Sequence, residues 1–282
     1  FRFRPLSSRS LRVPQVFQDT DFLNRCLSIA AEAADAAAAV TRGYFRREID
    51  VISKNDESPV TRADREAELA ARAVFEKHFP KHGIIGEEQG VSRGDAEFIW
   101  VIDPIDGTKQ FVTGNIGYGS LFALTWNGEP LLGLIDMPMK HERWAAARGL
   151  GTLFTDYRGT HRSHVRACPA LSDAMLTATA PEMFKGSKIP AFQRLSEAVR
   201  FTTWGNDCYG FGLLASGFVD LVVESSLGVY DYMALVPVIE EAGGIMTDWQ
   251  GAPLTLQSDG SVIAAGDRRC LEATLSLLAE SL

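Results

Sequence analysis

The sequence predicts an α+β fold in which an antiparallel sheet with flanking helices comes first and a mixed half of alternating helices and strands follows. Two observations lead to this fold class. Two long helical segments precede a run of strand segments joined by short turns, whereas helices and strands alternate after about residue 170. The 282 residues, 46% of them apolar, suffice for one large domain or two coupled halves.

The chain should begin its folded part with two helices. Residues 19–45 carry capping residues at 19–21 and apolar residues every three or four positions, which predicts a long helix. A second helix is expected over residues 61–79, because Pro80 follows its last apolar residue. Short strands are expected at residues 49–52, 84–85 and 98–102.

A hairpin is the strongest local prediction in the first half. Asn127-Gly128 stands between the apolar runs 121–126 and 131–136, and this dipeptide favours the tight turns of two-residue hairpins. Residues 144–147 and 151–155 should continue the same sheet. The antiparallel sheet of the fold class depends mainly on these four segments.

The second half should contain strands at 174–179, 201–203, 219–223, 245–247 and 262–265, with helices at 189–199, 209–216, 232–242 and 268–282. Gly243-Gly244 should end the third of these helices. The seam between the halves is expected near residues 156–165. This divides the chain into a flexible basic arm (1–17), an N-terminal half (18–158) that carries most metal ligands, and a C-terminal half (159–282) that carries the substrate residues.

Composition excludes several functional classes. A net charge of −8 argues against a nucleic-acid partner, and no apolar run approaches the ~18 residues of a membrane helix. Four scattered cysteines match neither a zinc site nor a disulfide framework, which indicates a reducing compartment. We therefore expect a soluble intracellular protein, in the cytoplasm or, if the basic segment 1–17 is the remnant of a transit peptide, in the plastid stroma.

The most informative segment is WVIDPIDGT, residues 100–108. An apolar strand ends there in Asp103 and Asp106, and a Gly-Thr pair follows at once. Carboxylates collected in this way repel each other unless a cation lies between them, so the segment predicts a metal site. The amides of Gly107 and Thr108 open a short helix, and helix N-termini bind phosphate oxygens.

Other acids also stand at the ends of apolar elements, namely Asp64, Glu87, Glu88 and Asp231. All-oxygen ligand sets suit hard cations, above all Mg²⁺ where a phosphate completes the shell. Each acid alone has a simpler explanation, since Asp before a helix is usually a cap, Asp-Gly a turn and Glu-Glu a solvated loop. The combination at 103–108 is the one that favours a metal.

The histidines do not suggest a second site. His78 and His82 lie on either side of Pro80, so one helix face cannot hold both, and His161 and His164 belong to a polar loop. No Ser-His-Asp pattern and no nucleophilic cysteine stands out. The carboxylates are therefore the main candidates for chemistry.

At this point the sequence resembles the inositol monophosphatase superfamily of Mg²⁺-dependent, lithium-sensitive phosphatases. The resemblance covers residues 20–280 and lies in SPVTRAD at 58–64, GEE at 86–88, WVIDPIDGT at 100–108 and YD…EEAGG at 230–244. It implies a layered α/β/α/β/α sandwich of the inositol monophosphatase and fructose bisphosphatase type. It also implies a homodimer that acts on a small phosphate monoester.

The resemblance further implies two to three Mg²⁺ ions in each active site. Glu87, Asp103 and the Ile105 carbonyl would hold the first ion. Asp103, Asp106 and Asp231 would hold the second, and a weaker third ion would lie near Glu87 with Glu88 close by.

The resemblance also assigns the catalytic residues. Asp64 and Thr108, together with the metal ligand Glu87, would serve catalysis, with Asp64 and Thr108 orienting and deprotonating a water that attacks phosphorus in line. Gly107 and Thr108 would bind the phosphate. No phosphoenzyme intermediate is implied.

The residues around 204–235 look most like the histidinol-phosphate phosphatase branch of this superfamily. Histidinol carries an ammonium group and a titratable imidazole, whereas inositol is neutral, so an additional acid, Asp207, would complement the cation. Glu224 could do the same but also suits inositol enzymes, and Asn206 could assist. The alternative role for Asp207 is to cap the helix at 209–216.

The leading hypothesis is thus hydrolysis of L-histidinol phosphate in histidine biosynthesis. The alternative within the same chemistry is an inositol-1-monophosphatase or a broader sugar-phosphate phosphatase. A non-catalytic protein that binds in a metal-gated manner would be expected to lose ligands, yet Glu87, Asp103, Asp106 and Asp231 are all present.

Overall fold

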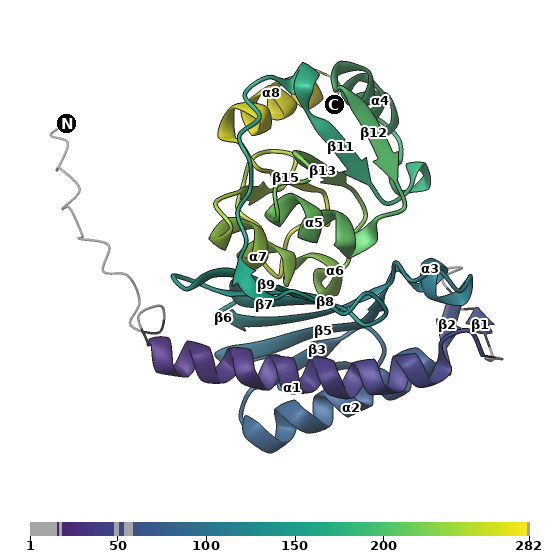
Figure 1. The fold of residues 1–282 in the computed structure, drawn as a ribbon, viewed down its shortest axis with the longest axis vertical. Coiled ribbons are helices and arrows are strands. Elements are labelled where there is room, and N and C mark those ends of the chain that lie inside the picture. Colours follow the sequence, from purple (N-terminus) through teal and green to yellow (C-terminus); the bar gives the residue numbers. More distant parts are fainter. Residues whose placement is uncertain (1–15, 17–18, 48–50, 54–58, 281–282) are drawn as a thin grey trace, which may run out of the picture.

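The computed structural model describes residues 16, 19–47, 51–53 and 59–280 as five stacked layers, two sheets alternating with three layers of helices (Figure 1). Separate groups of buried apolar side chains fill the spaces between the layers. This order confirms the α/β/α/β/α sandwich. The expected arm at 1–17, except Val16, and the first two residues of the expected strand at 49–52 lie outside the described residues.

The first layer consists of α1 (Thr20–Tyr44) and α2 (Arg62–His78), which confirms both predicted helices. Asp19 caps α1 by accepting the Phe22 N–H at 2.9 Å. A stripe of buried alanines on α1 lets α2 pack closely against it. From α2, the Phe75 ring stacks on Trp100 of the sheet with a centroid distance of 4.1 Å, which anchors the helices to the next layer.

The second layer is an eight-stranded sheet, in the order β10-β9-β8-β7-β6-β5-β3-β4, in which only β3 and β5 pair in parallel. The predicted hairpin is confirmed, with Asn127 and Gly128 both at positive φ (51° and 84°) as its turn requires. The strands are β3 (Gly83–Gly86), β4 (Gly90–Ser92), β5 (Phe98–Asp106), β6 (Gly119–Trp126), β7 (Glu129–Met137), β8 (Glu142–Ala147), β9 (Gly151–Asp156) and β10 (Gly159–Arg162). A separate pair is formed by β1 (Val51–Ser53) and β2 (Pro59–Thr61).

The middle layer contains α5 (Asp207–Ala215), α6 (Val229–Tyr232) and α7 (Leu235–Glu241), which lie between the two sheets (Figure 1). The prediction of one continuous helix over 232–242 is wrong, because the chain turns at residues 233–234 and starts α7 anew. Pro237 explains the break. Proline lacks an amide and clashes with the preceding turn in a helix interior, but it fits the first turn of a new helix.

The fourth layer is a five-stranded sheet, in the order β12-β11-β13-β15-β14, and the fifth contains α4 (Lys188–Ala198) and α8 (Arg268–Ala279). Strand β11 lies between β12 and β13 and pairs in parallel with both. The strands are β11 (Met175–Ala178), β12 (Phe201–Trp204), β13 (Leu221–Glu224), β14 (Ile245–Thr247) and β15 (Val262–Ala265), which confirms the five predicted strand positions. Asp267 caps α8 by accepting the Arg269 N–H at 2.9 Å.

The first sheet uses residues 83–162 and the second uses residues 175–265. The proposed division of the chain into halves near 156–165 stays a prediction, and its boundary at 158/159 would fall inside the β9–β10 hairpin. Among the described helices, none is long and apolar enough to cross a membrane.

Candidate active site

The site begins at the carboxyl end of β5, where the strand carries a β-bulge. Asp103 lies opposite Leu121 of β6 and Asp106 opposite Gly119, so three residue steps on β5 match two on β6. The Ser120 hydroxyl donates to the Pro104 carbonyl at 2.6 Å and fixes the bulged backbone. Gly107 then adopts a left-handed conformation (φ 79°) and caps α3 (Thr108–Val112).

Three aspartates converge at this point. Carboxylate oxygens of Asp103, Asp106 and Asp231 lie within 4.8 Å of one another among the described residues, with Asp231 supplied by α6 of the middle layer. Burial raises the pKa of Asp103 well above its ordinary value, and the neighbouring Glu87 and Asp106 raise it further. Burial and the charge of Asp106 raise the pKa of Asp231 in the same way. Such a group of buried, mutually repelling carboxylates fits a hard divalent cation.

The carboxylates open into a cavity of about 630 Å³. Seven acids line it, and they include most of the predicted ligands. They are Asp64, Glu87, Glu88, Asp106, Glu182, Asp207 and Asp231. The part of the lining from the second half of the chain, here called the C-terminal wall, includes Thr179, Glu182, Met183 and Lys185 before α4 and Ser226 and Leu227 after β13.

The two residues predicted to handle the nucleophilic water both reach this cavity. Asp64 lies in the first turn of α2 with only 2% of its surface exposed, and its carboxylate lines the cavity. The Thr108 hydroxyl donates to the Ile105 carbonyl at 3.2 Å. The Ile105 side chain is buried beside Phe111 and Tyr118, which keeps its carbonyl at the bulge.

Asp106 accepts the Cys208 N–H at 2.6 Å, from the start of α5. This contact orients the carboxylate towards the second half of the chain. The predicted phosphate contact of Gly107 stays a prediction.

Glu87 and Glu88 form the turn between β3 and β4. The Glu87 N–H donates to the Ile102 carbonyl at 3.3 Å, which places Glu87 beside the residue that precedes Asp103. Glu88 lies 3.6 Å from Arg65, measured from Oε2 to Nε. Sequence reasoning missed Glu68 of α2, which is buried beneath this turn. The sequence did contain a signal for it, because Glu68 follows Asp64 by four residues and therefore lies on the same apolar face of the helix as Asp64.

Asp207 is the first residue of α5 and lines the cavity. Its backbone is in the left-handed region (φ 43°), which non-glycine residues rarely occupy. Burial and the nearby Asp106 raise the pKa of its carboxyl to about 7, an effect that the neighbouring Gln110 amide partly offsets. The helix-cap alternative for Asp207 requires this residue to precede the helix. In the structure Asn206 takes the cap position and Asp207 is already the first helical residue, so the geometry does not support that alternative.

Asn206 and Glu224 lie behind the cavity wall. The Asn206 amide donates to the Thr177 hydroxyl at 2.7 Å. Glu224 is 1% exposed at the end of β13, where its Oε1 accepts the Thr179 N–H at 2.6 Å and burial raises its pKa to about 8. Glu224 thus holds Thr179, which does line the cavity. The substrate roles of both residues stay predictions.

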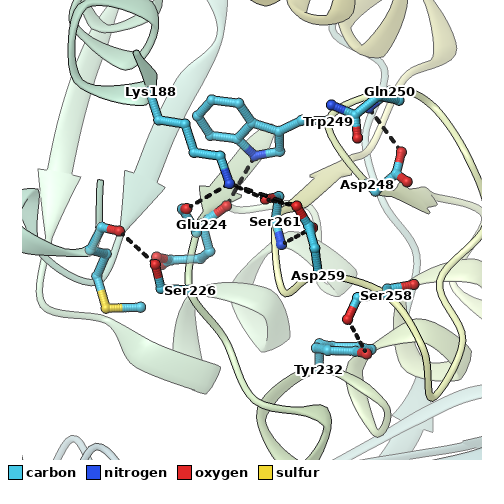
Figure 2. A network of polar contacts seen from close by, with 12 residues as sticks. Lys188, Glu224, Ser226, Tyr232, Asp248, Trp249, Gln250, Ser258, Asp259 and Ser261 are labelled. Carbon is cyan, nitrogen blue, oxygen red and sulfur yellow. Dashed lines mark hydrogen bonds and ion pairs between the residues drawn. The ribbon is translucent and has the colours of Figure 1, made fainter. Parts of the chain in front are cut away.

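The C-terminal wall is held by a network around Lys188 of α4 (Figure 2). The Lys188 ammonium donates to the hydroxyls of Ser225, at 3.2 Å, and of Ser261, and it lies 5.4 Å from the centre of the Trp249 ring. Next to it, the Ser226 hydroxyl donates to the Met183 carbonyl at 3.1 Å. These contacts join the segment before α4 to the segment after β13.

Comparison with known proteins shows which proteins this chain resembles. The model of the inositol monophosphatase family matches residues 23–282. The bifunctional phosphatase IMPL2, chloroplastic, of Arabidopsis thaliana is 44% identical over 90% of this chain and 75% of its own length. The histidinol-phosphatase of Chlorobaculum parvum is 36% identical over 84% of this chain and 91% of its own length.

The solved structures show the same relationship. An inositol monophosphatase from Zymomonas mobilis superposes with a TM-score of 0.83 and is 44% identical, over 91% of this chain and 98% of its own. This chain is therefore similar to proteins whose names include two different substrates.

Proposed function

This chain belongs to the inositol monophosphatase family, whose members are phosphatases, and we propose that it hydrolyses L-histidinol phosphate to L-histidinol and phosphate. The observation that carries the proposal is Asp207, an acid added to the cavity rim in a strained backbone conformation. Strain of this kind persists where the surrounding structure imposes it and is common at functional sites.

The ligand set fits Mg²⁺, on which the family generally depends. We propose that Asp103, Asp106 and Asp231 would hold one ion and that Glu87, Asp103 and the Ile105 carbonyl would hold another. A third, weaker site would involve Glu87 and Glu88. When bound, Mg²⁺ would neutralise phosphate charge and stabilise the oxygen of the departing alcohol.

The chain's own residues would prepare the attacking water. The Thr108 hydroxyl donates its hydrogen bond to the Ile105 carbonyl, so its oxygen can accept a hydrogen bond from water. The Asp64 carboxylate lines the same cavity and would accept the proton that the water releases. The new P–O bond would form as the P–O bond to histidinol breaks in line, and the alcohol oxygen would take a proton from solvent.

Recognition of the alcohol would rest on charge. Histidinol presents an ammonium and an imidazole, and Asp207 presents a carboxyl whose pKa near 7 allows it to ionise beside a cation. Glu224 and Asn206 would support this wall from behind, through Thr179 and Thr177. The histidinol-phosphatase from Chlorobaculum parvum, at 36% identity, supports this substrate.

Inositol 1-phosphate is the second candidate substrate. The Zymomonas mobilis protein, named as an inositol monophosphatase, is 44% identical over nearly the whole chain, and the Arabidopsis relative is named as bifunctional. A cavity of about 630 Å³ would accommodate either alcohol. A broader sugar-phosphate phosphatase would use the same chemistry with a cavity that selects less strictly among alcohols.

Steady-state phosphate release with Mg²⁺ separates the two. We expect kcat/KM for L-histidinol phosphate to exceed that for inositol 1-phosphate by about tenfold or more, because only histidinol offers a cationic partner to the partly buried Asp207 carboxyl. The reverse order would refute the histidinol assignment. No release from either substrate would favour the non-catalytic alternative, and loss of release on chelation with EDTA checks the metal.

We also propose a homodimer, which light scattering coupled to size-exclusion chromatography would test. The expected compartment is the cytoplasm. The name of the chloroplastic Arabidopsis relative supports the plastid alternative.

A further inference from the structure

We propose that Glu68 of α2 is a positioning residue that holds the Glu87–Glu88 turn in place for metal binding, an inference that rests on the proposed metal site. Glu68 has no exposed surface. Its Oε2 accepts the Glu88 N–H at 2.7 Å and its Oε1 accepts the Gln89 N–H at 3.1 Å. A buried carboxylate that accepts two main-chain amides fixes the path of the backbone between them.

Arg72 completes this arrangement from the next turn of α2. Its Nε donates to Glu68 Oε1 at 2.7 Å, and a second guanidinium nitrogen donates to the Gly90 carbonyl at 2.5 Å. The buried charge of Glu68 is therefore compensated, as burial requires. The two side chains together hold main-chain groups of residues 88, 89 and 90, so the turn is tied to α2 along its length.

The near side of the turn also packs directly against Glu68. A Cβ atom on Gly86 would lie 2.1 Å from Glu68 Oε1, so the carboxylate occupies the space that any side chain at this position would need. Glu87 therefore lies between two residues that contact Glu68. The Gly86 backbone packs on the Glu68 carboxylate, and the Glu88 N–H donates to it. This contact gives Gly86 a defined role in the GEE motif.

Spacing along α2 extends the role of Glu68. Asp64 and Glu68 are four residues apart and lie on the same buried face of the helix. Asp64 reaches the cavity and Glu68 reaches the turn that carries Glu87. One rigid helix therefore sets the distance between the proposed base and a proposed metal ligand.

The test is magnesium binding to the full chain by isothermal titration calorimetry without substrate. Glu68→Gln keeps the size of the side chain but replaces one acceptor oxygen with an NH₂ group, which cannot accept a main-chain N–H. We expect the Kd for Mg²⁺ to rise about 10- to 100-fold, the range seen when outer partners of metal ligands are removed. Phosphatase activity should recover largely at saturating Mg²⁺.

Glu76→Gln is the matched control, since Glu76 lies on the same helix with 53% of its side chain exposed and should leave the Kd unchanged. A Glu68→Gln protein that is less stable without metal but binds Mg²⁺ with wild-type affinity would overturn the proposal. A wild-type protein that binds no Mg²⁺ would overturn the metal assignment itself, and the two failures are therefore distinguishable.

A measurement on the wild-type protein remains decisive if Glu68→Gln does not fold. Hydrogen exchange of the metal-free protein should show protected amides at Glu88 and Gln89, because both donate to a buried acceptor. Exchange of these two amides as fast as in an exposed turn would refute the contact on which the proposal depends.

Discussion

Replacing Glu224 with glutamine should change how the stability of this protein depends on pH. Glu224 is 1% exposed, and burial raises the pKa of its carboxyl from the ordinary 4.5 to about 8. Below pH 4.5 the group is protonated in both the folded and the unfolded chain. Between pH 4.5 and 8 only the unfolded chain loses the proton, so the free energy of unfolding falls as the pH rises, and the loss is complete above pH 8.

The magnitude follows from the two pKa values. Each pKa unit corresponds to about 1.4 kcal/mol, so ionisation of Glu224 opposes folding above pH 8 by on the order of 5 kcal/mol. Glu224→Gln keeps an oxygen for the Thr179 N–H and cannot ionise. The variant should therefore become more stable relative to the wild type as the pH rises, by several kcal/mol between pH 5 and pH 9.

Urea unfolding at half-unit pH steps in EDTA measures this difference directly. The exposed Glu272→Gln on α8 serves as the control and should follow the wild-type curve. If the free energy of unfolding depended on pH in the same way for the wild type and Glu224→Gln, the Glu224 carboxyl would have the same pKa in the folded and unfolded states. That result would refute the reasoning.

Three substitutions test the site. Asp106→Asn should lower kcat by about 1,000-fold or more, because it removes charge from the proposed metal cluster, and near-normal phosphate release would remove that assignment. Asp207→Asn should raise KM for L-histidinol phosphate about tenfold and spare inositol 1-phosphate, since Asn tolerates the left-handed backbone; equal effects on both substrates would argue against a charge role. Lys188→Met should raise KM about tenfold with unchanged calorimetric Mg²⁺ affinity, because bonds to Ser225 and Ser261 hold the C-terminal wall of the cavity; a changed metal affinity would contradict this.

Local patterns predicted much of the fold. The 3.6-residue periodicity and end signals of α1 and α2, and the Asn127-Gly128 turn, depend on residues close in the chain, and the structure agrees with them. The edge strands β4 and β10 were missed, because these short, largely exposed segments, Gly-Val-Ser and Gly-Thr-His-Arg, carry no alternating apolar pattern. The break between α6 and α7 could have been predicted from Pro237.

The site shows the limit of sequence reasoning more sharply. The acids of 103–108 could be predicted as a cluster because one strand delivers them, whereas Asp231 required the family resemblance, since it comes from another layer more than 120 positions along the chain. Glu68 and Lys188 looked like ordinary charged residues of amphipathic helices. Their roles depend on long-range contacts with turns, which local periodicity does not encode.

The bulge in β5 limits how this enzyme can be redesigned. Side chains alternate along a regular strand, so residues three positions apart, such as Asp103 and Asp106, would point to opposite faces of a flat sheet. The extra residue restores their parity and also creates a place where Pro104, which has no amide for the ladder, costs no hydrogen bond. Inserting one residue between the two acids would reverse that parity and turn Asp106 away from Asp103. The length of this segment is therefore constrained independently of its composition, and variant libraries should exchange its residues without changing their number.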